Sequence, residues 1–200
     1  MKVRFIYYLG TVGKTSLFNL NIKGDYKEID KKNRTINAHT DKKIIEIDKK
    51  MVQLNIWDTA GEEKYHALAP NYYRDAEGAL LVLDITKIET LKLIEKWIDE
   101  INKIVGEDFQ ILIAANKYDL INESQINDEH LKEISEKYKI DYIYVSAKDN
   151  KNVDNSFNLL GNKIFTKHFS KSIKKKRTIK VIDTENKVQR NSVKKDGKCC

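Results

Sequence analysis

The sequence contains four short polar motifs whose residue types suit the binding of a phosphorylated purine. The first, Gly13-Lys14-Thr15, lies between a strand-like and a helix-like segment. Backbone amides at the positive end of a helix bind phosphate oxygens. Lys14 would reach the β and γ phosphates, and the Thr15 hydroxyl would ligate Mg²⁺. The simpler interpretation is a strand-to-helix turn with an incidental lysine.

This motif departs from the full phosphate-loop pattern G-x-x-x-x-G-K-[ST]. The pattern would place its opening glycine at Tyr8, whereas Gly10 lies only three residues before Gly13. An ungapped alignment puts a bulky tyrosine where the backbone must bend, and a gapped one leaves little loop to surround the β-phosphate. The sequence leaves both alignments open. The candidate phosphate-binding residues are Gly10, Thr11, Val12, Gly13, Lys14, Thr15 and Ser16.

A second motif, Asp58-Thr59-Ala60-Gly61, follows a predicted strand. Asp58 at a strand end can hold Mg²⁺, commonly through water, and the Gly61 amide can sense a γ-phosphate. A D-x-x-G sequence by itself is often only a turn.

The third and fourth motifs, Asn116-Lys117-Tyr118-Asp119 and Ser146-Ala147-Lys148, suit the recognition of guanine. The Asp119 carboxylate can accept from guanine N1–H and N2–H₂, whereas adenine lacks both donors and leaves the charge unpaired. Lys117 can lie along the base plane, Asn116 can brace the loops, and a backbone amide of 146–148 can meet guanine O6. Each motif alone could be a solvated loop, but four in this order, each after a predicted strand, indicate nucleotide binding.

Strand-like and helix-like segments alternate along the chain and position these motifs. Continuous apolar runs at 78–84 and 110–115 are typical of strands buried on both faces. Apolar residues at helical spacing predict a helix over 90–105. Residues 43–47 and 51–57 predict a hairpin.

This alternation predicts an α/β fold: a mostly parallel six-stranded sheet with one antiparallel edge strand and helices on both faces. The polar, aperiodic residues 21–40 predict a long loop. Ligands of such folds bind at the carboxyl ends of the strands, so the four motifs should meet at one site.

The excess positive charge lies at the C-terminal end. Residues 166–200 hold 12 Lys/Arg and 3 Asp/Glu, while the preceding 165 residues hold 25 basic and 27 acidic side chains. We predict a domain over 1–168 and a disordered basic tail over 169–200. A basic tail indicates an anionic partner, either nucleic acid or an acidic membrane surface. The run Lys174-Lys175-Lys176-Arg177 lacks the interleaved aromatics that stack on bases.

No stretch approaches the roughly 18 consecutive apolar residues of a bilayer-spanning helix. The N-terminus runs straight into a predicted strand and lacks a secretory h-region, so we expect a cytosolic protein. The two cysteines, Cys199 and Cys200, cannot form a disulfide between distant parts of the chain.

Together with the four motifs, three further stretches resemble the Rab family of Ras-superfamily small GTPases. These are Val52 to Gly61, Tyr72-Tyr73-Arg74 and Leu81 to Thr86. Tyr65 to Asp75 is similar to the early-endosomal, Rab-twenty-one-like group. The resemblance covers residues 3–165 and the terminal cysteines, and it implies a P-loop GTPase fold.

The resemblance implies a two-state switch that binds GTP or GDP with Mg²⁺ and hydrolyses GTP. In the GTP state Thr35 would ligate Mg²⁺ together with Thr15 and Asp58, and hydrolysis would release its loop. Glu62 would face the attacking water, with Lys14 as the second catalytic candidate. The implied partners are effectors, an exchange factor, a GTPase-activating protein and a prenyl-Rab chaperone, with no nucleic acid.

The terminal Cys199-Cys200 matches the double-geranylgeranyl end of many Rab proteins. Two lipid chains anchor stably where one is reversible, and basic residues add roughly 1 kcal/mol each near anionic lipid. The resemblance thus implies the cytoplasmic face of endosomal or vesicle membranes, with cycling through the cytosol. The alternative is a pair of exposed reactive thiols.

Two further departures from the family concern its activity. Glu62 stands where the family usually has glutamine. An ionised Glu62 cannot donate to phosphate oxygens and repels the γ-phosphate, which predicts slow hydrolysis. Thr40 stands where Rab proteins usually place the phenylalanine that packs with the equivalents of Trp57 and Tyr72, so effector choice does not carry over.

Two other function classes remain. A GTP-binding module that does not hydrolyse is favoured by Tyr8-Leu9 and Glu62. An ATP-using P-loop enzyme with a nucleic-acid-binding tail is opposed by Asp119. Nucleotide preference and phosphate release separate the three interpretations.

Overall fold

The computed structural model describes residues 2–8, 12–26, 39–58, 76–106 and 109–170. The chain divides into two compact units, Met1–Ile164 and Phe165–Cys200. Several predicted site residues lie outside the described residues: Gly10, Thr11, Thr35, Gly61, Glu62, Cys199 and Cys200. The predicted tail also lies outside them from residue 171 onward, and the domain boundary after residue 168 stays a prediction.

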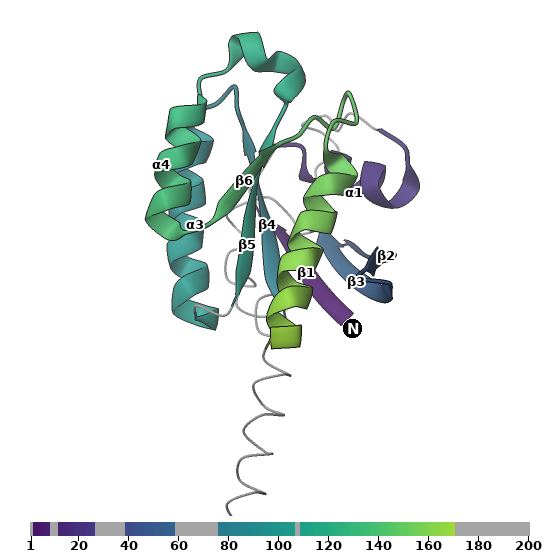
Figure 1. The fold of residues 1–200 in the computed structure, drawn as a ribbon. Coiled ribbons are helices and arrows are strands. Elements are labelled where there is room, and N and C mark those ends of the chain that lie inside the picture. Colours follow the sequence, from purple (N-terminus) through teal and green to yellow (C-terminus); the bar gives the residue numbers. More distant parts are fainter. Residues whose placement is uncertain (1, 9–11, 27–38, 59–75, 107–108, 171–200) are drawn as a thin grey trace, which may run out of the picture. The chain divides into compact units, whose positions relative to one another are not determined.

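Among the described residues, six strands form one sheet in the order β2-β3-β1-β4-β5-β6 (Figure 1). β2 pairs antiparallel with β3, and the other neighbouring strands pair parallel. This confirms the predicted α/β class with a mainly parallel sheet. The strands are β1 (Lys2–Tyr8), β2 (His39–Ile47), β3 (Lys50–Asp58), β4 (Gly78–Asp84), β5 (Gln110–Asn116) and β6 (Asp141–Tyr144).

The β2–β3 hairpin is longer than the sequence pattern predicts. Its turn consists of Asp48 and Lys49, whose φ angles of 49° and 61° are those of a type I′ turn. Pairing continues from Ile47 opposite Lys50 to His39 opposite Asp58. The prediction of a loop up to residue 40 is therefore wrong at its end, because backbone pairing with β3 extends β2 into a polar segment that has no apolar alternation of its own.

The helices are α1 (Lys14–Lys23), α3 (Glu89–Val105), α4 (Asp128–Tyr138), the 3₁₀ helix η2 (Tyr118–Glu123) and a final helix over residues 153–170. Figure 1 shows α3 and α4 on one side of the sheet and α1 with residues 153–164 on the other. The predicted loop of residues 21–40 is also wrong at its start, because α1 continues to Lys23 before the left-handed Gly24, with φ 73°, caps it.

The core lies between the sheet and these helices. Every residue of β4 is buried, as its continuous apolar run predicts. α3 buries one stripe of apolar residues at helical spacing, which confirms the predicted amphipathic helix. None of the described helices is long and apolar enough to cross a bilayer.

Candidate functional site

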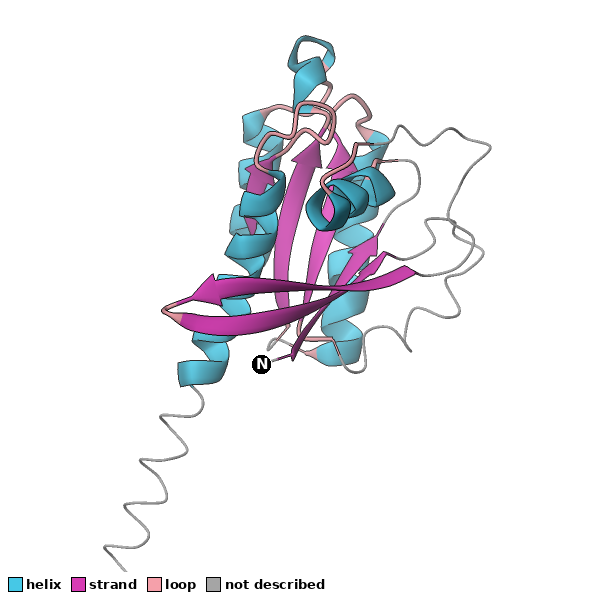
Figure 2. Cartoon of the chain, turned by 90° about the vertical axis from the view of Figure 1, so that its right-hand side faces the viewer, coloured by secondary structure: helices cyan, strands magenta, loops and turns pink. Residues whose placement is uncertain are grey.

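The carboxyl ends of the parallel strands bring the sequence motifs to one edge of the sheet. Figure 2 shows the arrowheads of the central strands pointing toward the same group of loops. Asp58 ends β3 and Asn116 ends β5, while Ser146 follows β6 and Lys14 begins the helix after β1. The structure thus places the described parts of all four motifs at a single end of the sheet.

Asn116 joins the phosphate-loop candidate to the base-reading candidates. Its side chain is buried, and its Nδ2 donates to the carbonyl oxygen of Val12 at 2.8 Å. Its Oδ1 accepts from the backbone N–H of Ala147 at 3.2 Å. One amide group therefore holds three segments together that are far apart in the sequence.

Gly13 occupies a backbone position that other residues cannot adopt without strain. Its φ of 91° is left-handed, and an added Cβ would lie 2.4 Å from Asn116 Nδ2. Its carbonyl accepts from Leu17 N at 3.0 Å and so begins α1. The glycine thus allows Asn116 to approach the start of the helix closely.

Asp119 is fixed by the fourth motif. Ser146 Oγ donates to Asp119 Oδ1 at 2.6 Å, and the same hydroxyl oxygen accepts from Asp149 N at 3.0 Å. Tyr118 N donates to the carbonyl of Val145 at 3.1 Å, which ties the two loops together through their backbones. Ser146 is fully buried while Asp119 is partly exposed. The carboxylate is therefore held in one direction and stays accessible.

Sequence reasoning missed three contacts that support these loops. Lys117 Nζ lies 2.6 Å from Oδ2 of Asp84, a fully buried carboxylate. Lys151 Nζ lies 3.6 Å from the centroid of the Tyr118 ring, which also packs on Tyr144 at 5.3 Å between centroids. The signal for Asp84 was an acidic residue at the end of an otherwise apolar buried strand.

Lys14 is almost completely buried at the first position of α1. Burial lowers the pKa of its ammonium to about 8, although the charge of Asp58 opposes this shift. α1 has no side-chain cap at its N-terminus and no acidic residue in its first turn. This end of the helix keeps the positive potential that favours an anion.

Asp58 is fully buried, and neither carboxylate oxygen has a hydrogen-bond partner among the described residues. Burial raises the pKa of its carboxyl group, although the nearby Thr15 hydroxyl and then the charges of Lys14 and His39 oppose the rise. A hard cation such as Mg²⁺ takes oxygen ligands of this kind. Asp58 and Thr15 therefore fit a magnesium site, whose third predicted ligand, Thr35, is outside the described residues.

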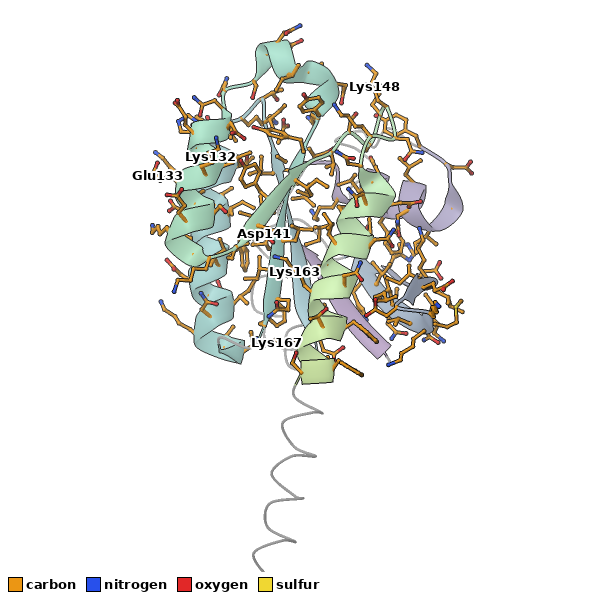
Figure 3. The ribbon with its side chains drawn as sticks, in the orientation of Figure 1. Lys132, Glu133, Asp141, Lys148, Lys163 and Lys167 are labelled. Carbon is orange, nitrogen blue, oxygen red and sulfur yellow. The ribbon has the colours of Figure 1, made fainter. Side chains whose placement is uncertain are left out.

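Ala147 is buried and Lys148 is exposed. Figure 3 shows the Lys148 side chain at the loop end of the sheet, pointing outward. The predicted contribution of residues 146–148 is a backbone amide, which does not require this side chain. Val12 and Ser16 are buried beside Gly13 and Lys14.

Comparisons with known proteins identify the family. A sequence model of the Ras family matches residues 8–166. The Ras-related protein Rab-21 of Rattus norvegicus is 33% identical over 201 residues, covering 96% of this chain and 87% of that protein. Rab-21 of Geodia cydonium is 38% identical over 148 residues; the match covers 74% of this chain and 64%, less than two thirds, of that protein. Rab-11A of Dictyostelium discoideum is 36% identical over 146 residues, covering 73% and 67%. The chain belongs to the Ras family, as a Rab small GTPase similar to Rab-21.

Proposed function

We propose that this Rab GTPase is a membrane-tethered guanine-nucleotide switch that acts on endosomes or vesicles. Rab proteins are small GTPases of membrane trafficking, and GTP hydrolysis is the reaction of the family. The observation that carries the proposal is the Asn116 side chain, which bonds to Val12 on one side and to Ala147 on the other. A site held in this way receives a phosphate and a base at fixed relative positions.

In the proposed site Asp119 reads guanine. Its Oδ1 already accepts from Ser146, so the hydroxyl sets the direction in which the carboxylate meets N1–H and N2–H₂. Lys117 covers one face of the base, and a backbone amide of residues 146–148 donates to O6. Adenine would leave the carboxylate without donors, which excludes ATP as the preferred ligand.

In the proposed phosphate subsite, Gly13 and Lys14 surround the β and γ phosphates. The anionic phosphates stabilise the charged form of Lys14, which burial disfavours. Thr15, Asp58 and Thr35 hold Mg²⁺, and Gly10, Thr11, Val12 and Ser16 complete the phosphate contacts. Ras-family GTPases generally use Mg²⁺, which when bound neutralises charge on the β and γ phosphate oxygens. Gly61 senses the γ-phosphate.

Glu62 is proposed to make hydrolysis slow. Its carboxylate accepts from the attacking water but, when ionised, cannot donate to the phosphate and repels it. We expect Glu62→Gln to raise the single-turnover rate of GTP hydrolysis by roughly 10-fold or more, measured with and without a GTPase-activating protein. Equal rates of the two proteins under both conditions would contradict this role of Glu62.

Binding of fluorescent GDP, GTP and ATP in the presence of Mg²⁺, followed by phosphate release, tests the function as a whole. We expect tight binding of GDP and GTP, weak binding of ATP and slow release of phosphate. A protein that ignores guanine nucleotides at millimolar concentration would refute the proposal. Preference for ATP would instead favour a P-loop enzyme of another class.

A non-hydrolysing GTP-binding module is the second candidate, and a feature of the strand supports it. β1 continues through Tyr8, which pairs with Leu81, so only residues 9–13 connect it to α1. This connection is shorter than the full phosphate-loop pattern requires. Binding of GTP without any phosphate release, also in Glu62→Gln, would favour this candidate.

Membrane tethering is proposed through a basic tail over residues 169–200 that follows a domain of residues 1–168. Prenyl groups on Cys199 and Cys200 would anchor it, and a prenyl-Rab chaperone would return it to the cytosol. Effectors, an exchange factor and a GTPase-activating protein would act on its two states on the cytoplasmic face. Flotation of prenylated wild type with anionic vesicles, compared with the Cys199→Ser/Cys200→Ser variant, tests the anchor; equal flotation would refute it.

A further inference from the structure

Asp84 is a fully buried carboxylate that none of the four sequence motifs contains. It is the last residue of β4, a strand buried along its whole length. Burial of a carboxylate costs free energy unless the group is paired and hydrogen-bonded. The partners of Asp84 therefore indicate its role.

Two residues compensate the Asp84 carboxylate. Oδ1 accepts from the backbone N–H of Thr86 at 3.0 Å and from Thr86 Oγ1 at 2.6 Å. Oδ2 lies 2.6 Å from Lys117 Nζ, as an ion pair whose geometry is not that of an aligned hydrogen bond. Among the described residues no hydrogen-bond donor reaches Oδ2, so the Lys117 ammonium is what compensates this oxygen.

Because the backbone at both Lys117 and Asp84 is fixed, their ion pair restricts the conformation of the Lys117 side chain. Lys117 is left-handed, with φ 69° and ψ 37°, a conformation that costs a non-glycine residue free energy and persists only where its surroundings impose it. Asp84 stands opposite Asn116 in the β4–β5 register, and Ile85 N donates to Asn116 O at 3.1 Å. Both ends of the Asp84–Lys117 pair are thus attached to backbone that is itself fixed.

The exposure of the pair is unequal. The side chain of Lys117 is 33% exposed, whereas that of Asp84 is completely buried. Part of the lysine side chain therefore remains accessible at the loop edge while its charged end is directed toward the interior. A long side chain held at both ends offers its methylene groups as a fixed apolar surface.

We propose that Asp84 is a positioning residue for the nucleotide base, holding the Lys117 ammonium so that the methylene stem lies flat along the purine face. This inference rests on the proposed guanine-nucleotide site. A methylene stem contacts a purine face whatever substituents the edge carries, so Asp84 contributes to affinity and residence time rather than to the choice between purines. Asp119, at the edge of the base, makes that choice.

The test is a double-mutant cycle of Asp84→Asn and Lys117→Met, read as the dissociation rates of ribose-labelled fluorescent GDP and IDP from the full-length chain. IDP lacks the 2-amino group that Asp119 reads. We expect Asp84→Asn to accelerate release of both nucleotides by about tenfold, with the ratio of their rates unchanged. In the Lys117→Met background the same change should alter release by less than about twofold, because no ammonium remains to be positioned.

Two results would overturn the inference: unchanged release from Asp84→Asn, or an equal acceleration in the Lys117→Met background. Thr86→Val is the matched control, since it removes a donor to the same carboxylate but keeps Lys117. It should accelerate release by less than about threefold. An effect as large as that of Asp84→Asn would mean that Asp84 supports the loop without acting on the lysine.

A second variant keeps the test available if Asp84→Asn does not fold. Asp84→Leu combined with Lys117→Met replaces the ion pair by an apolar pair. Its GDP release should match that of Lys117→Met alone, and release about tenfold faster would overturn the inference. A wild-type chain that binds neither nucleotide refutes the proposed function, whereas normal binding with an unaffected Asp84→Asn refutes only the role of Asp84.

Discussion

The base-reading side and the phosphate-binding side of the site satisfy their polar groups in different ways. On the base side Asn116, Lys117 and Asp119 each have a protein partner within 3.2 Å. On the phosphate side the Asp58 carboxylate is buried without a hydrogen-bond donor among the described residues. Lys14, beside it, is buried deeply enough to lower the pKa of its ammonium.

This difference gives the two sides different tasks: the base side selects the nucleotide, and the phosphate side couples ligand binding to the stability of the fold. Groups already held by the protein lose little freedom on binding, so the base side can discriminate between purines at small entropic cost. The burial of the Asp58 carboxylate, whose oxygens have no hydrogen-bond donor among the described residues, costs free energy that a bound cation would offset. Ligands on the phosphate side should therefore stabilise the folded chain strongly, while the base side determines which nucleotide does so.

The largest effect is expected from Asp119→Asn on the base side. An amide cannot accept from both guanine donors, but it can donate to the 2-oxo group of xanthine while accepting from N1–H. We expect GDP affinity to fall by at least about 100-fold and affinity for xanthosine diphosphate to rise, measured by competition against fluorescent GDP. Melting of the nucleotide-free chain should change little.

Glu133→Gln is the control for this prediction, because Glu133 is exposed on α4 away from the loops (Figure 3). It should leave both affinities unchanged. If Asp119→Asn lost affinity for guanine and xanthine nucleotides alike, the carboxylate would act on loop structure and the contrast between the two sides would fail.

The sequence predicted the elements of this site better than it predicted their contacts. The buried strands follow from continuous apolar runs such as 78–84, and the motifs after them follow from residue type and spacing. The start of β2 was missed because pairing with β3, rather than local propensity, extends the strand to His39. Propensity describes a segment, whereas pairing depends on its neighbour.

The contact of Asp84 could not be predicted from the sequence for the same reason. Its partner Lys117 is distant in the sequence and lies beside it only because β4 and β5 are adjacent and parallel. The burial of Asp58 without a hydrogen-bond partner among the described residues was equally invisible, since it is a property of the folded chain. Residue types indicated what these groups could bind, but not which of them the protein itself satisfies.

Gly13→Ala tests the connection between the two sides. The added methyl would lie 2.4 Å from Asn116 Nδ2, in a residue with φ 91°. Relief of this overlap must displace Asn116 from Val12, so we expect a loss of about 2–3 kcal/mol in the free energy of unfolding, measured with urea, and faster GDP release. Both sides of the site should then be disturbed together.

Gly24→Ala provides the matched control, because Gly24 is also left-handed, with φ 73°, but has nothing within 4 Å of an added Cβ. It should cost only the backbone strain, about 1 kcal/mol, and leave GDP release unchanged. Equal losses in the two variants would show that Asn116 does not depend on the close approach of Gly13.

The smallest effect is expected from Asp58→Asn on the phosphate side, and this variant should raise the free energy of unfolding rather than lower it. An amide is neutral, so burying it costs less than burying a carboxylate whose desolvation the Thr15 hydroxyl and the Lys14 charge offset only in part; we expect the nucleotide-free chain to gain about 1 kcal/mol in urea unfolding. The gain in melting temperature on adding GDP with Mg²⁺ should shrink, because the variant has lost an oxygen ligand for the cation. Asp99→Asn, an exposed change on α3, should do neither. If Asp58→Asn instead destabilised the nucleotide-free chain, the protein itself would stabilise the carboxylate. The polar groups of the phosphate side would then be satisfied by protein partners, as those of the base side are.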